Sequence, residues 1–333
     1  MTLLIEAIAE DLPGEKWRRI FDRHWPAYRR WFLQNGISKP ATYLQSLKAL
    51  RTYMPELVPT YERICELAGG GDLEARFLSM WCPPAYVGGC SQAIYLEQDT
   101  IALIRNYDYS PKLLEGTLIA SRFLGRRVVA MSDCLWGVLD GINESGLAVS
   151  LSFGGRPDVG EGFGIPLVLR YVLEVCSDVT SAVSVLSGLP VHMGYSIALV
   201  DRRGNHAIVF LTPNNLVEVV DARVVTNHQH KPSWKRYAAA TRSVERERAL
   251  KKALKNATDL NSLTEAFLRD PVYQQAYEAG YGTLYTSLYR PDEASIELIW
   301  PNQRWKQSCA AFQENKYLIT FTEAPNPVSS RMA

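Results

Sequence analysis

A cysteine that directly follows a glycine is the residue of this sequence best suited to covalent chemistry. Cys90 comes after Gly89, and Arg105 and Asp108 follow fifteen and eighteen residues later. If the chain is cut between Gly89 and Cys90, the cysteine gains a free α-amine, whose unperturbed pKa is about 7.7–8.0. That amine can act as the base for the thiol of the same residue, so no histidine is needed. The layout predicts an enzyme that cuts itself and then uses Cys90 as a nucleophile.

Arg105 and Asp108 have two open interpretations. One hairpin would bring the end of a second strand beside Cys90, where Arg105 would favour the thiolate by charge and Asp108 would accept hydrogen bonds from the new ammonium group. Alternatively, Arg105 and Asp108 form a structural ion pair of modest worth, and Cys90 is an inert core residue. The position of Cys90 between glycines and a serine, where helical composition gives way to strands, favours catalysis.

Four short motifs, taken together, resemble the N-terminal-nucleophile (Ntn) hydrolases. Their order and spacing are most similar to the acyl-CoA:6-aminopenicillanic acid acyltransferase type, also called the C45 peptidase family. Choloylglycine hydrolases and penicillin V acylases are more distant cousins. The motifs are Gly89-Cys90-Ser91, Arg105-Asn106-Tyr107-Asp108-Tyr109, the stretch from Asp140 to Leu147, and Val225-Thr226-Asn227. The resemblance runs from about Tyr61 to Glu323.

The resemblance implies a fold and a division of the chain. It implies an α+β protein with a four-layer αββα sandwich, in which the nucleophile begins the first core strand. Residues 1–89 would be a helical pro-segment, released or retained as a small subunit, and residues 90–333 the Ntn-hydrolase catalytic domain. The two self-cleavage fragments are expected to associate with each other.

Asn227 is the oxyanion donor that the resemblance implies, although an asparagine at a strand end also commonly fills a turn. In the choloylglycine branch a second donor matches positions 150–153, where this chain has neither asparagine nor tyrosine. A backbone N–H is therefore expected in that role. A late arginine of the same branch has only Arg290 as a possible match.

The expected reaction is cleavage of linear amide bonds through a thioester on Cys90. Tyr107, Tyr109 and Phe163 are expected to line a pocket for an apolar acyl group. Water or an amine would take the acyl group, and coenzyme A is a possible acyl carrier substrate; no other cofactor is expected. The glycine-rich stretch 154–164 lacks the lysine and the serine or threonine of a phosphate-binding loop, so it is either a flap near the pocket or a plain connection.

The resemblance implies a small-molecule amide or acyl substrate as the partner, and composition argues against nucleic acid and membranes. The 333 residues are 47% hydrophobic and 21% charged, with a formal net charge of +1, which gives no field for nucleic acid. No apolar run approaches the roughly 18–20 residues that span a bilayer. The first residues lack both a basic region and a long apolar run, so we expect a cytoplasmic protein.

The remaining cysteines and histidines suggest neither a metal site nor a disulfide framework, because no Cys-x-x-Cys pair occurs and only His228 and His230 lie close together. Two alternatives to the self-cleaving enzyme stay open. One is an uncleaved thiol hydrolase with His228 as the base, and the other is a binding protein on the same scaffold that never matures. Whether the chain is cut distinguishes them.

Hydrophobic periodicity predicts helices before Cys90 and mainly strands after it. The early helices are expected at 15–36, kinked near Pro26, at 42–67, bent near Pro55 and Pro59, and at 72–81. Later helices are expected at 166–176, 180–186, 234–252 and 260–269, and the charges between 231 and 255 are interpreted as a solvated helix face. Strands are expected at 93–96, 101–104, 117–120, 127–131, 147–153, 196–200, 207–211, 216–220, 223–226, 284–289, 295–300 and 317–322.

Overall fold

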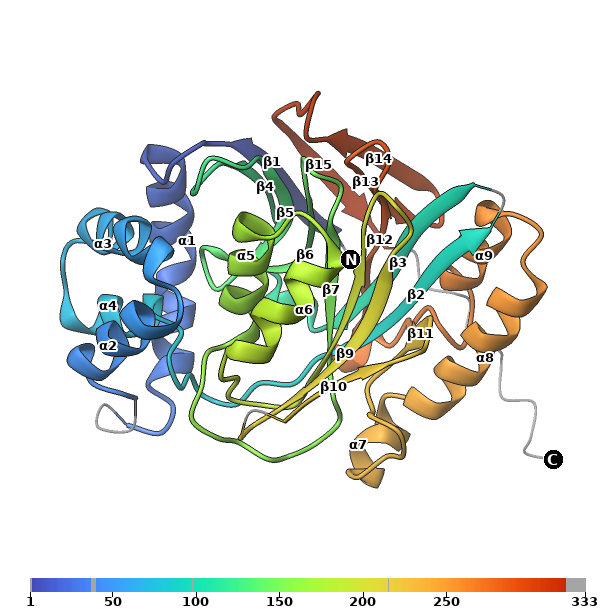
Figure 1. Cartoon of the computed structure of the whole chain (residues 1–333), viewed down its shortest axis with the longest axis horizontal. Helices are drawn as coiled ribbons and strands as arrows, with labels where there is room; N and C mark the ends of the chain where they lie inside the picture. The colour runs from blue at the N-terminus through green and yellow to red at the C-terminus, as the bar shows by residue number, and fades with distance from the viewer. Residues whose placement is uncertain (1, 37–39, 98, 215, 322–333) are drawn as a thin grey trace.

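The computed structural model of the protein describes residues 2–36, 40–97, 99–214 and 216–321. The described chain is a mixed α+β fold with two sheets, which confirms the predicted class (Figure 1). The larger sheet has the strand order β10 (Leu216–Val220), β9 (His206–Thr212), β8 (Tyr195–Val200), β7 (Ala148–Phe153), β6 (Gly137–Asn143), β5 (Val128–Asp133), β4 (Thr117–Ser121), β1 (Thr2–Ala9) and β15 (Asn315–Thr320). The smaller sheet has the order β11 (Val224–Val225), β2 (Gly89–Glu97), β3 (Thr100–Tyr109), β12 (Gly282–Arg290), β13 (Ser295–Trp300) and β14 (Gln303–Ser308).

Helices flank both sheets. Helix α5 (Ile165–Val175) contacts β6 and β7, and α6 (Val179–Gly188) contacts β9 of the larger sheet. On the smaller sheet, α8 (Ser243–Asn256) contacts β2 and α9 (Leu260–Phe267) contacts β3. The two sheets meet through contacts of β2 and β3 with β7 and β8. Figure 1 shows the strands between α5 and α6 on one side and α8 and α9 on the other.

The hairpin of β2 and β3 positions the predicted site. Cys90 lies opposite Tyr107 in the antiparallel register, and Gly89 lies opposite Asp108. Because side chains alternate along a strand, Cys90 and Arg105 share the face that meets the larger sheet, whereas Asp108 lies on the other face. On the first face Gln92 hydrogen-bonds with serine hydroxyls of β7; on the second, Asn106 donates to the Phe267 carbonyl of α9.

The expectation that the whole segment before Cys90 is helical is wrong for its first residues. Residues 2–9 form β1, which pairs in parallel with β4 and antiparallel with β15. Ile5 and Ala7 are buried there and Leu4 is exposed, so one face of the strand joins the core. The helices follow as α1 (Glu15–Phe32), α2 (Tyr43–Tyr53), the short η1 (Pro55–Leu57), α3 (Val58–Leu67) and α4 (Asp72–Leu78).

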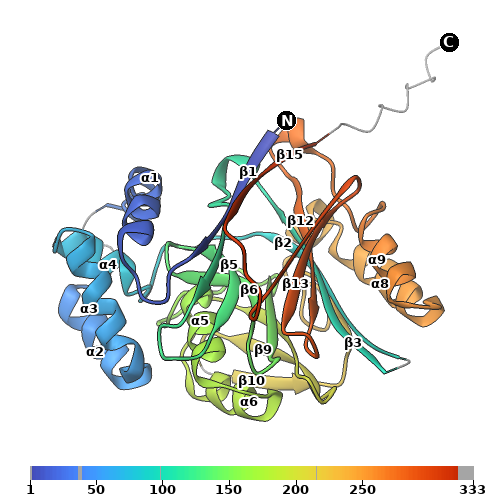
Figure 2. The same cartoon turned by 90° about the horizontal axis from the view of Figure 1, so that it is seen from above.

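Helices α1 to α4 gather at one end of the larger sheet (Figure 2). Indole groups link them to the loop that follows β5: Trp17 donates to the Leu135 carbonyl at 3.0 Å, and Trp136 donates to the Leu78 carbonyl at 2.8 Å. Helix α1 continues through Pro26. The first 89 residues are therefore attached to the rest of the chain both by a strand and by packed helices.

The single helix expected at 234–252 is two helices, α7 (Lys235–Ala240) and α8. Arg242, between them, has a left-handed backbone with φ 52°. Its guanidinium binds the carboxylates of Glu245 and Asp270, which stabilises the break. The break starts α8 at Ser243 and directs Arg246 of its first turn into the protein, where it is completely buried.

Two short 3₁₀ turns, η2 (Pro111–Leu113) and η3 (Tyr277–Ala279), complete the elements of the described residues.

Candidate active site

The thiol of Cys90 faces a buried guanidinium. Arg105 donates from Nη2 to Sγ of Cys90 at 3.2 Å. The other donors of Arg105 bind the Tyr285 hydroxyl at 3.0 Å and the Leu151 carbonyl at 3.0 Å, and Asp140 lies 3.3 Å from Nη1. Since Asp140 and Leu151 belong to the larger sheet, Arg105 is held from both sheets. Its ion-pair partner is Asp140, so the alternative of an Arg105–Asp108 pair is wrong.

Burial governs the protonation of this thiol. Cys90 is 1% exposed, and burial raises its pKa to about 11, although the positive charge of Arg105 lowers the pKa. In the intact chain the thiol is therefore protonated at neutral pH. The proton needs an acceptor before the sulfur can attack a carbonyl carbon.

The backbone of Cys90 is bound from the opposite face of the hairpin. Its N–H donates to Oδ1 of Asn227 at 2.9 Å, and its carbonyl accepts from Nη1 of Arg246 at 2.6 Å. Arg246 also donates from Nη2 to Oδ1 of Asn227 at 2.6 Å. Asn227 and Arg246 thus hold the two backbone groups of Cys90 and hold each other.

Asp108 belongs to the same buried cluster. It accepts a hydrogen bond from Thr283 at 2.7 Å and forms an ion pair with Arg246 at 3.3 Å. Burial raises the pKa of Asp108, against the lowering effect of Arg246. Asp108 was predicted to hold the α-amine of Cys90. In the intact chain the Cys90 N–H binds Asn227 instead. Asp108 pairs with Arg246, which in turn binds the Cys90 carbonyl.

Two donors converge on one carbonyl oxygen just before the predicted cut. Nδ2 of Asn227 donates to the Gly88 carbonyl at 3.3 Å, and the Tyr237 hydroxyl of α7 donates to the same oxygen at 2.6 Å. Nδ2 also binds the Phe153 carbonyl at 3.2 Å. The acceptors around Nδ2 and the donors around Oδ1 fix the orientation of the amide.

The predicted cleavage position has no room for a side chain. A Cβ atom at Gly89 would lie 3.0 Å from Cβ of Asp108 and would overlap the Tyr281 hydroxyl. Glycine is therefore required here for close packing of β2 against its neighbours.

His228 contacts Asn227 indirectly, through the hydroxyl of Ser243. Its Nδ1 lies 2.7 Å from the Ser243 hydroxyl, which accepts a hydrogen bond from the Asn227 backbone N–H at 2.9 Å. Nε2 lies 3.5 Å from Glu247. Both ring nitrogens thus face partners other than the Cys90 thiol. His230 is exposed and contacts Glu218.

Arg246, Tyr237, Thr283 and Asp140 were not predicted as site residues. Arg246 lies in the charged stretch 231–255, and the interpretation of those charges as a solvated face is wrong for this residue. Arg290, the match considered for a late arginine, ends β12 at its turn to β13. Arg242, whose left-handed backbone precedes α8, directs the helix so that Arg246 lies within reach of Cys90. No sequence signal indicated this backbone conformation.

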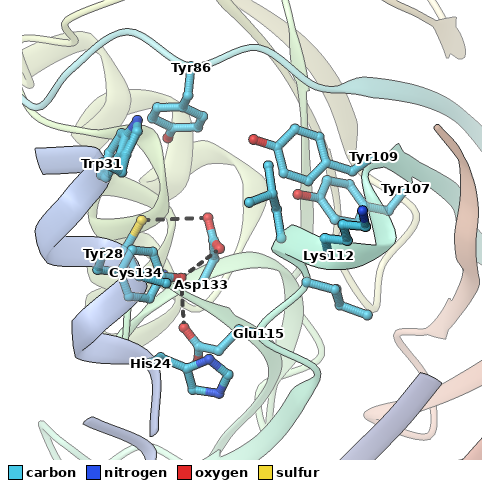
Figure 3. Close-up of a pocket in the computed structure, with 13 residues that line it drawn as sticks. His24, Tyr28, Trp31, Tyr86, Tyr107, Tyr109, Lys112, Glu115, Asp133 and Cys134 are labelled. Carbon is cyan, nitrogen blue, oxygen red and sulfur yellow. Dashed lines mark hydrogen bonds between the residues drawn. The ribbon is translucent and has the colours of Figure 1, made fainter. Parts of the chain in front are cut away.

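Two of the three predicted pocket residues share a cavity. Tyr107 and Tyr109 line a pocket with a volume of about 150 Å³, together with Tyr86 and residues of α1 (Figure 3). Phe163 is not among its lining residues; it is buried against Trp81, with ring centroids 4.8 Å apart. The stretch 154–164 is bound to the chain around residues 80–82 and 190–194 and does not line this pocket, so the interpretation as a plain connection is favoured.

In residues 2–36, 40–97, 99–214 and 216–321, no group of three or more histidine, cysteine or acidic side chains could hold a metal ion. In the same ranges, every helix is too short or too polar to cross a membrane.

Comparisons with known proteins agree with the resemblance noticed in the sequence. The family model described as acyl-coenzyme A:6-aminopenicillanic acid acyl-transferase matches residues 95–305, a range that includes Arg105, Asp108 and Asn227 and begins just after Cys90. No curated protein sequence matches the chain.

The chain is also similar to solved structures that include a bile acid hydrolase and a penicillin V acylase. A mutant of conjugated bile acid hydrolase from Clostridium perfringens has 14% identity and a TM-score of 0.49, covering 72% of this chain and 99% of that one. Penicillin V acylase from Agrobacterium tumefaciens has 15% identity and a TM-score of 0.44, covering 69% of this chain and 86% of that one.

Proposed function

The chain belongs to the acyl-coenzyme A:6-aminopenicillanic acid acyl-transferase family, and from this premise we propose that it is a self-processing amide hydrolase with Cys90 as its N-terminal nucleophile. Acyl transfer to an amine is a secondary activity of the same thioester. The observation that carries the proposal is the enclosure of Cys90: a guanidinium binds its sulfur, and Asn227 and Arg246 bind its backbone N–H and carbonyl.

Maturation begins with the thiol of the intact chain. The sulfur bonds to the Gly89 carbonyl carbon, the bond from that carbon to the Cys90 nitrogen breaks, and the nitrogen takes up the proton that the thiol loses. Water then hydrolyses the thioester, giving a carboxylate on Gly89 and a free thiol on Cys90. The lack of a side chain on Gly89 and its close packing support attack at this carbonyl.

In the matured enzyme the new α-amine replaces the histidine of conventional thiol hydrolases. It accepts the thiol proton as the sulfur attacks the substrate carbonyl, and it returns a proton to the leaving amine. Oδ1 of Asn227, which binds the Cys90 N–H in the intact chain, remains an acceptor that orients this amine. Asp108 balances the charge of Arg246 and keeps the cluster fixed.

Asn227 and Tyr237 are the proposed donors to the oxyanion of the tetrahedral intermediate. In the intact chain both donate to the Gly88 carbonyl, on the acyl side of the bond to be cut. Once that segment moves away, the same two donors are available to a substrate carbonyl oxygen. Tyr237 then takes the role for which a backbone N–H was expected. Burial raises the pKa of Tyr237, which keeps its hydroxyl protonated as a donor.

The proposal includes an acyl pocket and a domain arrangement. The aromatic walls formed by Tyr107 and Tyr109 support an acyl group with an apolar chain. Contacts of α5 and α6 with one sheet, and of α8 and α9 with the other, support a four-layer αββα order. Strand β1 supports a retained N-terminal fragment of residues 1–89 beside a catalytic fragment of residues 90–333.

Intact mass and turnover test the function together. Purified protein should separate under denaturing conditions into residues 1–89 and 90–333, and it should hydrolyse N-acyl p-nitroanilides. Cys90→Ala should stay whole and inactive, whereas Cys65→Ala, a matched change at a half-buried cysteine of α3, should be cut and active. Active wild-type protein that remains whole, or cleavage in Cys90→Ala, would contradict the mechanism.

A further inference from the structure

The pocket lined by Tyr107 and Tyr109 has two carboxylates at its base. Glu115 and Asp133 both contact the hydroxyl of Tyr28 on α1, at 3.0 and 3.3 Å (Figure 3). That hydroxyl also accepts a hydrogen bond from the Cys134 backbone N–H. A phenol has one proton to donate, so Tyr28 can satisfy only one of the two carboxylates at a time.

One carboxylate oxygen in this pocket lacks a partner. Glu115 is 6% exposed, and its Oε2 accepts from Tyr28 and from the Leu135 backbone N–H at 2.9 Å. Its Oε1 is buried and has no hydrogen-bond donor in the part of the chain that the structure describes. An acceptor in that state carries an unmet desolvation cost, which a ligand donor would remove.

The protein supplies little positive charge to offset these acids. Burial lowers the pKa of His24, so this half-buried ring is neutral at pH 7, and its Nε2 also lacks a partner within the described chain. Lys112 is exposed at the rim, and no ion pair joins it to either acid among the described residues. Burial and the charge of Glu115 raise the pKa of Asp133 to about 7. Asp133 is therefore only partly ionised at pH 7, and a cation beside it would favour its ionised form.

Aromatic rings form the walls above the acids. Tyr86, Tyr107, Tyr109 and Trp31 line the same cavity, and Figure 3 shows the tyrosines and the indole around the space above Asp133. Aromatic faces attract cations and also pack against methylene groups. Walls of this kind over a carboxylate base fit an alkyl chain with a cationic end.

The pocket lies on the acyl side of the thiol. In self-cleavage the acyl group is the chain that ends at Gly89, and this chain runs along the pocket: Tyr86 lines it, and a Cβ at Gly88 would lie 3.3 Å from the Tyr109 ring and 3.8 Å from the Tyr107 ring. Tyr107 is also the strand partner of Cys90. Substrate hydrolysis forms its thioester on the same sulfur, so its acyl group should enter the same space.

We propose that this pocket selects acyl groups whose chain ends in a protonated amine, which binds the free oxygen of Glu115 together with Asp133. The proposal rests on the function proposed above and narrows the substrates to ω-aminoacyl amides.

A pair of equally long substrates tests the selection. The p-nitroanilides of 6-aminohexanoic and heptanoic acid differ by an ammonium group in place of a methyl group. We expect kcat/KM for the aminoacyl substrate to exceed that for the neutral one by at least about tenfold. A tenfold ratio corresponds to about 1.4 kcal/mol, which is less than a hydrogen bond to a charged group typically contributes. Equal values, or preference for the heptanoyl substrate, would overturn the proposal.

Variants connect the preference to the carboxylates. Glu115→Gln and Asp133→Asn should each reduce the ratio of the two kcat/KM values towards one, while Glu62→Gln, an exposed glutamate of α3, should keep the wild-type ratio. A ratio unchanged in both pocket variants would refute the role of these acids. Correctly cut protein that turns over neither substrate would count against the proposed function instead.

A binding measurement tests the pocket without turnover. Calorimetry with the Cys90→Ala chain should detect 6-aminohexanamide binding at least tenfold more tightly than heptanamide, and Glu115→Gln in that background should remove the difference. Absence of any difference between the two amides would reject the pocket as a cation site whatever the enzyme activity proves to be.

Discussion

Arg105 and Arg246 approach Cys90 from opposite faces of one hairpin and act on different atoms. Arg105 touches the sulfur between the sheets, and Arg246 touches the carbonyl on the side of α8. Each is completely buried and each has a carboxylate partner, Asp140 for Arg105 and Asp108 for Arg246. The separation allows the charge near the thiol to be set independently of the groups that bind the backbone N–H and carbonyl of Cys90.

The two reactions of Cys90 should differ in their pH dependence. In the intact chain the thiol, with a pKa of about 11, is protonated below that pH, so the thiolate fraction and the cleavage rate should rise about tenfold per pH unit between 7 and 10. In cut protein the α-amine must be unprotonated to act as the base, so turnover should rise with pH and level off above about 8.

Both profiles can be measured on one preparation, by mass spectrometry of freshly refolded chain and by p-nitroaniline release from cut chain. His228→Ala should preserve the turnover profile and most of the rate, because its ring nitrogens contact Ser243 and Glu247. Loss of turnover in folded, cut His228→Ala protein would favour a conventional thiol mechanism.

Tyr237→Phe tests the second oxyanion donor. Removal of one such donor typically lowers kcat by about 100-fold or more, a loss of about 3 kcal/mol in transition-state stabilisation, with a smaller effect on KM. We expect that pattern in steady-state kinetics of the cut variant. Tyr53→Phe on α2 is the matched control. A variant in which KM rises while kcat is unchanged would assign Tyr237 to substrate binding alone.

Strand β1 is the element that makes the N-terminal segment part of the core. It lies between β4 and β15, so both of its edges are paired. Ile5 is completely buried, whereas its neighbour Leu4 is 46% exposed. The strand therefore offers a test in which the same kind of truncation is made on its two faces.

Ile5→Ala should destabilise the protein by about 2–5 kcal/mol, because it removes buried methyl groups and leaves a cavity. Leu4→Ala should cost less than about 0.5 kcal/mol, as is usual at exposed sites. Urea unfolding of both variants in the uncut Cys90→Ala background gives the two free energies of unfolding. Equal costs at the two positions would contradict the pairing of β1 within the sheet.

Sequence patterns located most elements because their apolar residues follow the period of the structure they form. Strands with strong apolar runs, such as residues 101–104 and 196–200, lie within β3 and β8. Strand β14 was not predicted, since Trp305 is its only large apolar residue and its other side chains are polar. β1 was missed because alanine and glutamate weaken its alternation.

The site was predictable where it depends on neighbours in one hairpin and unpredictable where it depends on distant packing. The spacing of Cys90, Arg105 and Asp108 in the sequence follows from the register of β2 and β3. These two strands are almost consecutive in the chain, so their pairing can be predicted from residue spacing. The approach of Arg246 depends on a left-handed residue and on pairing with Asp108 across the interior. Charged residues in a surface-type pattern give no signal of such burial.

At the scale of the whole molecule, the fragments should remain together after the cut. Residues 1–89 contribute β1 to the larger sheet, the helices α1 to α4, and the Tyr28 side of the pocket. Size-exclusion chromatography of cut wild-type protein should give the same elution volume as uncut Cys90→Ala, while denaturing gels resolve two fragments. Elution of residues 90–333 alone would show that the N-terminal segment is released.

The position of β1 between β4 and β15 in the larger sheet also affects how the protein can refold after it has been unfolded. In the uncut chain β1 is tethered to its partners, so their pairing is intramolecular and its rate does not depend on protein concentration. After the cut the same pairing requires two separate polypeptides to meet, and its rate depends on their concentration. The proposed cleavage would therefore fix an order of events: the chain would fold as one molecule and be cut, and the two fragments would then have no unimolecular route back to the same fold.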